Sequence, residues 1–288
     1  MSHPVIKAFF HHDSSTLTYV VHCPTTKICC VIDAALDYDI YSGDISSDCL
    51  TQLYDYIREQ ELSVEWILET HAHADHMTAS QEIKKSLGGK IAVGCGIKDV
   101  QASVRTMLNL PKDSLNTLDF DQLLEDGQSI ALGNLTINVM ATPGHTPDSV
   151  TFVIGDNAFV GDTLFMPDSG SARCDFPNGS AAQLYQSIQK IYQLGDHVNL
   201  YMCHDYQPNG RALAYVCNVA EQKQSNIQIN EMINEQDYVN NRESRDQKLA
   251  IPRLLYPALQ INVRGGKLPP VESNQQAYIK MPLQLKTQ

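Results

Sequence analysis

The chain has 288 residues, 43% of them apolar, and a formal net charge of −12 at pH 7. This length and composition predict a packed domain, because enough apolar surface is available to form a core. The acidic balance argues against nucleic acid or an anionic membrane as partners, since both require clustered Lys and Arg. No apolar run approaches membrane-spanning length, so we expect no transmembrane helix.

Strands and helices are expected to alternate through the first hundred residues. The first ten residues read as neither a secretory signal nor an Arg-rich transit peptide. The stretch 17–33 then predicts two short strands around a turn at 24–27. The elements expected after it are a helix within 49–61, a strand at 64–68, a helix at 76–87 ending at Gly88 and Gly89, and a strand at 90–93.

The second half continues this alternation and then changes character. Its expected elements are strands at 135–142, 151–154 and 158–160, a helix at 181–192 with one apolar stripe, and a strand at 200–203. Residues 211–250 are predicted to be mostly helical, and residues 251–288 to be extended. Interspersed strands and helices are typical of sheets covered by helices, so we expect an α/β layered domain. We place its core at 1–210 and an appendage packed on the core at 211–288.

The eight cysteines are scattered along the chain, and none forms a Cys-x-x-Cys pair. In a chain of this length, such a distribution is typical of reduced thiols and not of a disulfide framework. We therefore expect a cytoplasmic protein.

The stretch THAHADH, residues 70–76, places three histidines and one aspartate in six positions directly after a predicted strand. His71, His73 and Asp75 are spaced by two, and in an extended backbone this spacing projects their side chains to one side. The two spacer residues are alanines, which leave room for an ion. His76 follows at the expected helix start and turns in a different direction. The stretch predicts either a metal cage or a polar helix start that is rich in histidine.

Three more potential ligands follow predicted strands, namely His145, Asp162 and His204. The end of a strand is rigid on one side and open on the other, as a site requires. A lone histidine after a strand is more often a surface or core residue than a ligand. Seven imidazoles and carboxylates at the ends of four strands, however, favour a metal site that needs no thiolate.

Around these ligands the sequence resembles the metallo-β-lactamase fold superfamily. The resemblance rests on His-x-His-x-Asp-His at 71–76, Gly144-His145-Thr146, Gly161-Asp162 and the late His204. It implies an αββα sandwich with the metal site at one edge between two sheets. The superfamily includes thioester hydrolases, lactonases, nucleases, β-lactamases and oxygenases, so this resemblance leaves the reaction open.

Longer stretches are similar to the persulfide dioxygenases, the sulfur dioxygenases related to the ethylmalonic encephalopathy protein. These stretches are 70–79, 142–149, 171–176 and 204–206. Two others, 32–39 and 261–266, resemble a bacterial branch often labelled β-lactamase-like hydrolase. The resemblance implies one Fe(II) per chain, with glutathione persulfide and O2 as substrates and sulfite and glutathione as products.

Matched residue by residue, the iron ligands of this family are His71, His145 and Asp162. Two imidazoles and one carboxylate leave three coordination positions open, the arrangement expected of a non-haem Fe(II) oxygenase. The resemblance makes the remaining four residues groups that orient ligands or water, namely His73, Asp75, His76 and His204. The alternative uses all seven residues for two zinc ions bridged by Asp162, as in hydrolases of this fold. The residue types are the same in both cases.

The resemblance also implies residues that hold the substrate. Arg173 matches the arginine that contacts glutathione in the family, and Tyr206 matches a tyrosine near the same pocket. A guanidinium fork suits a carboxylate, although Arg173 could instead form a surface ion pair with a neighbouring aspartate. Many members have Asn-Pro-Arg where this chain has residues 226–228, so Arg253 is the candidate replacement for that contact.

The sequence therefore predicts a persulfide dioxygenase. The first alternative is a glyoxalase II-like dizinc thioester hydrolase, or a lactonase, that acts through a metal-bound hydroxide. The second is a metal-binding protein without catalysis, against which the seven intact ligands argue. The acidic charge and the Pro- and Gly-containing tail are compatible with a homodimer.

Overall fold

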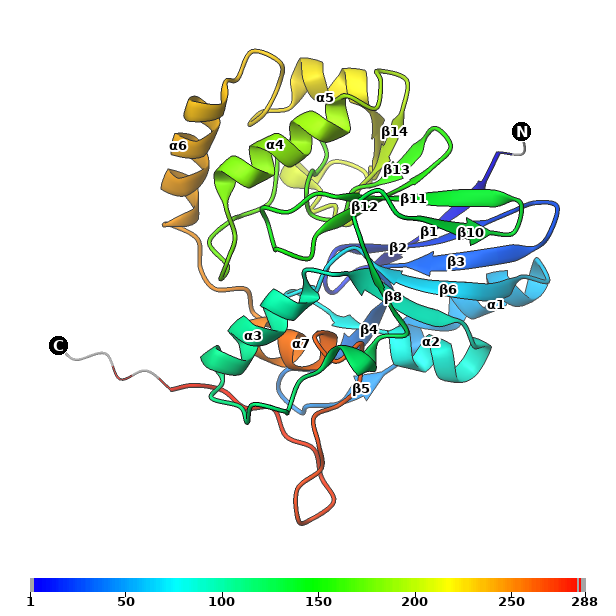
Figure 1. The fold of residues 1–288 in the computed structure, drawn as a ribbon, viewed down its shortest axis with the longest axis vertical. Coiled ribbons are helices and arrows are strands. Elements are labelled where there is room, and N and C mark those ends of the chain that lie inside the picture. The colour runs from blue at the N-terminus through cyan, green and yellow to red at the C-terminus, as the bar shows by residue number, and fades with distance from the viewer. Residues whose placement is uncertain (1–2, 284, 286–288) are drawn as a thin grey trace.

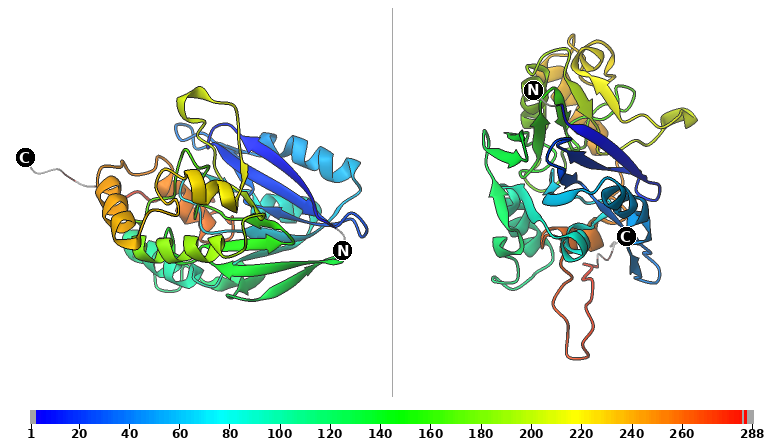
Figure 2. Two further views of the ribbon diagram at one scale, coloured as in Figure 1. Left: turned by 90° about the horizontal axis from the view of Figure 1, so that it is seen from above. Right: turned by 90° about the vertical axis from the view of Figure 1, so that its right-hand side faces the viewer.

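The chain folds into four layers, with two β-sheets packed face to face between two layers of helices (Figure 1). The computed structural model describes residues 3–283 and 285. This αββα sandwich confirms the predicted α/β fold class. Figure 2 shows the same layers from two further directions.

Each large sheet has six strands. The first, in spatial order, contains β1 (Val5–His11), β2 (Thr16–His22), β3 (Ile28–Ile32), β6 (Ser63–Glu69), β8 (Lys90–Gly94) and β9 (Gln122–Leu124). The second contains β10 (Ser129–Leu132), β11 (Leu135–Ala141), β12 (Val150–Ile154), β13 (Asn157–Phe159), β14 (Asn199–Tyr201) and β15 (Val216–Asn218). A small third sheet joins β5 (Ile45–Ser46), β4 (Ala35–Tyr38) and β7 (Met77–Thr78).

The helices form the two outer layers. Packed with the first sheet are α1 (Thr51–Glu59), α2 (Ser80–Leu87), α3 (Ile97–Met107) and α7 (Leu255–Asn262). On the side of the second sheet are α4 (Ala181–Tyr192), α5 (Val219–Ser225) and α6 (Glu235–Asp246). Short 3₁₀ turns lie at η1 (Asp48–Leu50), η2 (Thr117–Asp119) and η3 (Pro208–Gly210).

Alternation along the strands explains how each sheet packs on both faces. In β2, Tyr19 and Val21 lie in the core between the two sheets, whereas Val20 packs in the core beneath the helices. In β12, Phe152 belongs to the central core and Val153 to the core under α4. Strands covered on both faces read as nearly continuous apolar runs, which is the pattern of the predicted strands.

Three helices differ from the sequence-based expectations. Helix α2 begins at Ser80 and not at residue 76, because Met77 and Thr78 pair with β4 as the short strand β7. Helix α7 lies in the region expected to be extended. Its residues are buried on almost every side, so it has no amphipathic stripe to mark it as a helix. Helix α3 was not predicted.

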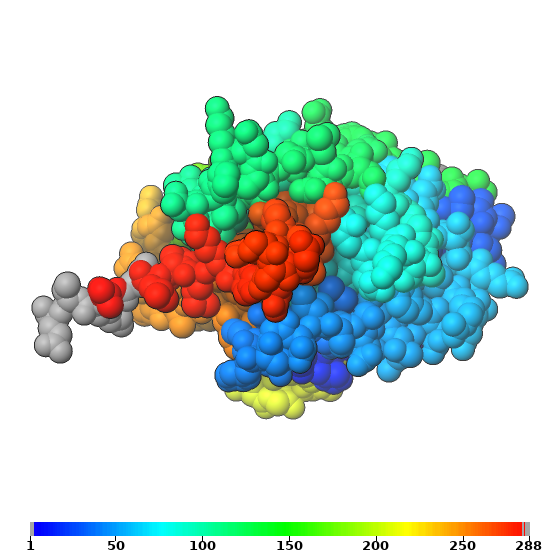
Figure 3. Space-filling view, turned by 90° about the horizontal axis from the view of Figure 1, so that it is seen from below, coloured from blue at the N-terminus to red at the C-terminus, as the bar shows by residue number. Residues whose placement is uncertain are grey.

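The predicted appendage contributes to both outer layers. Strand β15 pairs with β14 at the edge of the second sheet, α6 packs on α4, and α7 packs in the core of the first sheet. The division at residue 210 stays a prediction. Gln260, within α7, exchanges two hydrogen bonds with the backbone of Lys280, each 2.9 Å long. These bonds fix the segment that follows α7, which is seen in orange to red in Figure 3.

All eight cysteines are free, as expected for scattered thiols. Among the described residues, no helix combines the length and the apolar character that crossing a bilayer requires.

Candidate metal centre

The strands that precede the predicted ligands all end at the same edge of the sandwich. In the second sheet, β13 runs parallel to β14, and β11 has the same direction because two antiparallel pairings separate it from β13. In the first sheet, β6 runs parallel to β3. A bridge between Thr16 and His204 and a hydrogen bond from the Val150 N–H to the Thr70 carbonyl join the sheets at this edge. All seven predicted ligands therefore meet there.

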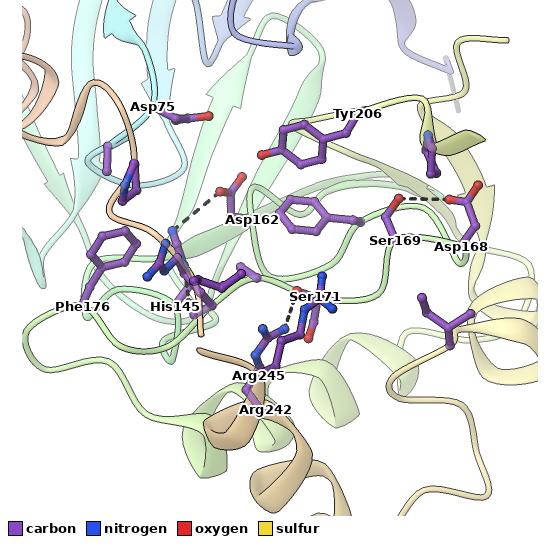
Figure 4. Close-up of a pocket in the computed structure, with 18 residues that line it drawn as sticks. Asp75, His145, Asp162, Asp168, Ser169, Ser171, Phe176, Tyr206, Arg242 and Arg245 are labelled. Carbon is purple, nitrogen blue, oxygen red and sulfur yellow. Dashed lines mark hydrogen bonds and ion pairs between the residues drawn. The ribbon is translucent and has the colours of Figure 1, made fainter. Parts of the chain in front are cut away.

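His71, His145 and Asp162 form one group. One potential ligand atom from each lies within 4.8 Å of the other two. The Asp162 Oδ2 atom is 3.8 Å from His71 Nε2. It is 3.6 Å from His145 Nε2, as Figure 4 shows. All three side chains are buried. Two imidazoles and a carboxylate that converge in this way can hold one metal ion.

The other four predicted ligands form a second group beside the first. The potential ligand atoms of His73, Asp75, His76 and His204 also lie within 4.8 Å of one another. His204 Nε2 is 3.0 Å from Asp75 Oδ2 and 3.4 Å from Asp162 Oδ1, so His204 and Asp162 link the two groups.

Buried polar atoms without hydrogen bonds mark this region as a ligand site. Five of them belong to the predicted ligands: His71 Nε2, His73 Nδ1, His76 Nε2, His204 Nε2 and Asp162 Oδ1. A buried polar atom that lacks a hydrogen bond costs roughly 1–3 kcal/mol. Native proteins seldom leave such atoms together unless a bound group satisfies them. A divalent metal ion would satisfy these imidazole and carboxylate atoms, so the donor set fits a metal.

Hydrogen bonds on the far side of the rings prepare His71 and His145 for metal binding. The Thr70 hydroxyl donates to Asp33 Oδ2 at 2.9 Å, so its oxygen can accept from His71 Nδ1 at 3.1 Å. His145 Nδ1 donates to the Arg173 carbonyl at 2.7 Å. Each ring therefore carries its proton on Nδ1 and directs the lone pair of Nε2 to the centre, which is the form that binds metals.

Burial and charge shift the pKa values of the histidines in opposite directions. Burial, together with the nearby His73 and His145, holds the pKa of His71 well below its usual value. Burial also lowers the pKa of His76, to about 4. Burial would lower the pKa of His204 too, but the carboxylates of Asp75 and Asp162 outweigh it and raise this pKa to about 9. The carboxylates thus give the centre a negative field that favours a cation.

Three buried residues that the sequence analysis did not select hold the ligand loop in shape. Asp33 accepts from the Thr70 N–H at 2.7 Å and from His73 Nε2 at 3.1 Å. Asp148 accepts from the Ala72 N–H at 2.8 Å. Asn262, in α7, donates to the carbonyls of His73 and His76, each at 2.8 Å. The contacted residues are: Thr70, Ala72, His73 and His76. The only signal for these three was their position within the stretches that carry the family resemblance.

A cavity of about 490 Å³ opens beside the metal group. Asp75, His145 and Asp162 line one end, and Tyr206 lines a side (Figure 4). Phe165 is also among the lining residues. The Tyr206 ring stacks on His204 with the centroids 5.6 Å apart and an 8° angle between the planes. The cavity is large enough for a small organic ligand with one end at the metal group.

Three arginines line this cavity, and they differ in their hydrogen-bond and ion-pair partners. Arg173 forms two hydrogen bonds with Asp175, at 2.6 and 2.7 Å. Arg242 is buried and paired with Asp246. Arg245 is exposed, and in the described part of the chain its side chain has neither a hydrogen bond nor an ion pair, so it is the uncompensated cation of this wall.

Two of the three predicted substrate residues therefore line the cavity, and the third does not. Arg173 and Tyr206 line the cavity, and Arg173 also forms the ion pair with an aspartate that was its alternative role. Arg253 is exposed and is not among the lining residues. Arg245, eight positions earlier, was missed because an exposed arginine on a polar helix gives no local signal.

The family model of the metallo-beta-lactamase superfamily matches residues 13–204. The chain belongs to this superfamily. The matched range contains all seven predicted ligands, and the observed sandwich is the fold that the resemblance implied.

Relatives with different names are similar over most of the chain. A beta-lactamase hydrolase-like protein of Agrobacterium fabrum is 45% identical over 97% of this chain, which spans 65% of that protein. Glyoxylase B2 of Dictyostelium discoideum is 42% identical, with 96% of each chain covered. The human mitochondrial persulfide dioxygenase ETHE1 is 30% identical, with 70% of this chain and 68% of the relative covered.

Among solved structures, the crystal structure of ETHE1 from Myxococcus xanthus has a TM-score of 0.73 and 26% sequence identity. It covers 91% of this chain and 100% of its own. The names of these relatives thus differ in the reaction that they state.

Proposed function

We propose that this superfamily member is a persulfide dioxygenase that holds one Fe(II) through His71, His145 and Asp162. The observation that carries the proposal is the convergence of these three side chains, two of which, His145 and Asp162, line the cavity. Two histidines and one carboxylate are the ligand set of non-haem Fe(II) oxygenases, because they leave coordination positions open for substrates.

The proposed reaction converts RSSH, O2 and H2O to RSH, sulfite and two protons. Iron, when bound, supplies the one-electron chemistry with O2 that no side chain provides. The buried ligands fix the position of the reaction, and the surrounding apolar side chains exclude bulk water. The similarity to the human persulfide dioxygenase and to the Myxococcus xanthus structure supports this reaction.

The far wall of the cavity suits an anionic carrier for the persulfide. Glutathione has two carboxylates, and a guanidinium group binds a carboxylate through parallel hydrogen bonds. Arg173 is already paired with Asp175, whereas Arg245 has no partner among the described residues. We therefore assign the carboxylate contact to Arg245, and Tyr206 lines the same cavity.

A thioester hydrolase is the second candidate, and one observation favours it. His73, Asp75, His76 and His204 add a second complete group of donors, which suits a second metal ion. The similarity to Glyoxylase B2 agrees with that reaction. In this case a metal-bound hydroxide is the nucleophile, and O2 is not consumed.

Metal content and two substrates separate these candidates. The full-length protein is purified without added metal, its iron and zinc are counted, and aliquots loaded with either metal receive glutathione persulfide or S-lactoylglutathione. We expect one iron per chain and O2 consumption with the persulfide, and no hydrolysis of the thioester. Two zinc ions per chain with thioester hydrolysis and no O2 consumption would replace the dioxygenase by the hydrolase.

A further inference from the structure

A second cavity is separate from the substrate cavity. It has a volume of about 580 Å³, and its lining includes His11, His12, Asp37, Asp48 and Cys49. Its lining shares no residue with the cavity that contains Asp162 and Arg245. Neither candidate reaction uses the polar residues that line this second cavity.

His11, Asp37 and Cys49 are close enough to suggest a metal site, but their atoms already have partners. His11 Nε2 donates to Asp37 Oδ1 at 3.1 Å, and the Cys49 N–H donates to Asp37 Oδ2 at 2.8 Å. The Cys49 thiol donates to the Ala35 carbonyl at 3.3 Å. These atoms differ in this respect from the unpartnered atoms of the metal centre, so the group has another role.

A continuous row of hydrogen bonds leads from this group to the metal centre. His11 Nδ1 lies 2.6 Å from Ser14 Oγ, and Ser14 Oγ lies 2.6 Å from Thr16 Oγ1. Thr16 Oγ1 lies 3.2 Å from His76 Nδ1 and 3.4 Å from His204 Nδ1. Thr16 is fully buried, whereas the Asp37 side chain is 31% exposed at the second cavity. The row therefore joins the surface to two candidate ligands.

The direction of every hydrogen bond in the row follows from the carboxylate. Burial raises the pKa of Asp37, but hydrogen bonds from Cys49 and His11 outweigh it and hold the pKa below its ordinary value, so Asp37 accepts. With its proton on the Nε2 atom that faces Asp37, the His11 ring accepts through Nδ1. The Ser14 hydroxyl then donates to His11, and the Thr16 hydroxyl donates to Ser14.

This direction leaves Thr16 Oγ1 as an acceptor for both histidine rings, which is what the rings require. His204 Nδ1 also lies 3.3 Å from the Ser15 carbonyl, and His76 Nδ1 lies 3.3 Å from Asp75 Oδ1. Neither of these oxygens can donate, so both rings carry a proton on Nδ1. A Thr16 hydroxyl that pointed toward the rings would place two donors face to face.

We propose that Asp37 and His11 are positioning residues for the metal centre. They set the direction of the hydroxyl row so that Thr16 holds the rings of His76 and His204 with Nε2 facing the metal position. The proposal concerns the rings of the second group of donors. These rings would hold the second metal ion in the thioester hydrolase candidate, and they would orient ligands or bound water in the dioxygenase.

Two substitutions disturb the row at its surface end, where His11 is three hydrogen bonds away from His76 and His204. In D37N, the remaining oxygen still accepts from Cys49, but the new amide donates to His11 and reverses every later bond. In H11F the row is interrupted. H12F is the matched control, because His12 is exposed and lines the same cavity without joining the row.

The readouts use full-length protein loaded with Zn²⁺ at pH 8. They are the rate at which a chelator removes Zn²⁺ and the rate at which the Nδ1–H protons of His76 and His204 exchange with water, observed by NMR. We expect D37N and H11F to raise both rates about tenfold, as is usual for outer partners of ligands, and H12F to change neither.

A second variant keeps the test decisive if one of these proteins does not fold. S14A breaks the row between His11 and Thr16, and it should raise both rates as H11F does. The double variant H11F/S14A should behave like either single variant, because both remove the same connection. Rates in H11F, D37N and S14A that equal those of H12F and the unmodified protein would overturn the proposal.

Discussion

The two walls of the substrate cavity differ in how firmly they are held. On one wall, the loop 70–78 is buried and its backbone is bound by Asp33, Asp148 and Asn262. On the other wall, Arg245 and Leu249 come from the late helical segment and are exposed. The buried wall can fix the position of a metal ion, and the exposed wall can change without disturbing it. The chemistry and the choice of substrate are thus assigned to different parts of the chain.

Replacing Asp162 tests the buried wall most severely. D162A removes the carboxylate that lies between His71 and His145 and should leave the centre unable to retain its metal. We expect activity to fall at least about a hundredfold, since even outer partners of metal ligands cost about ten- to a hundredfold. Metal content after dialysis is the measurement. D168A is the control, because Asp168 lines the same cavity but pairs with Arg211, and it should keep its metal.

Removing the metal should make the stability of the buried wall depend on pH. The pKa of His204 is raised from 6.5 to about 9, so protonated His204 stabilises the metal-free fold fully below pH 6.5. This contribution, on the order of 3 kcal/mol, is lost as the pH rises from about 6.5 through about 9. Denaturant unfolding of metal-free protein at several pH values measures it. If H204Q showed the same decline as the unmodified protein, His204 would not be the cause.

Asn262 tests whether the last helix holds the ligand loop. N262A leaves the carbonyls of His73 and His76 without their donor. The free energy of unfolding should fall by at least about 2 kcal/mol, because each buried carbonyl left unpaired costs about 1 kcal/mol or more. N274A removes an exposed asparagine and should change the free energy little. Equal unfolding curves for the two variants would show that α7 does not support the loop.

Arg245 tests the exposed wall and should have the smallest effect. R245A should raise KM for glutathione persulfide about fivefold, equivalent to about 1 kcal/mol for an exposed ion pair, and leave kcat and metal content unchanged. R253A is the matched control, since Arg253 is exposed outside the cavity. A change in KM with R253A and none with R245A would return the assignment to Arg253.

The sequence predicted the buried wall better than the exposed one for a physical reason. The ligands alternate with small residues directly after a strand, so the spacing alone indicates that they point to one side. Their supports cannot be found in this way, because Asn262 is separated from His73 by 189 positions and Asp33 by 40. Such contacts exist only once the sheets and helices have been assembled.

The sequence contains no pattern that identifies the residues of the exposed wall. Arg245 and Arg253 are both arginines in a polar region, and only the path of the chain after α6 determines which one lines the cavity. Helix α7 was missed for the opposite reason. It is buried on nearly every side, so its apolar residues show no helical stripe, and its proline suggested an extended segment.

The hydrogen bonds from Asn262 to the ligand loop have a consequence for the synthesis of the protein on the ribosome. All seven candidate ligands have been translated by residue 204, but the carbonyls of His73 and His76 gain their donor only when residue 262 has left the exit tunnel. Domains assemble from the N-terminus as they are synthesised. The nascent chain thus carries every candidate ligand for some sixty residues before the ligand loop can gain this donor.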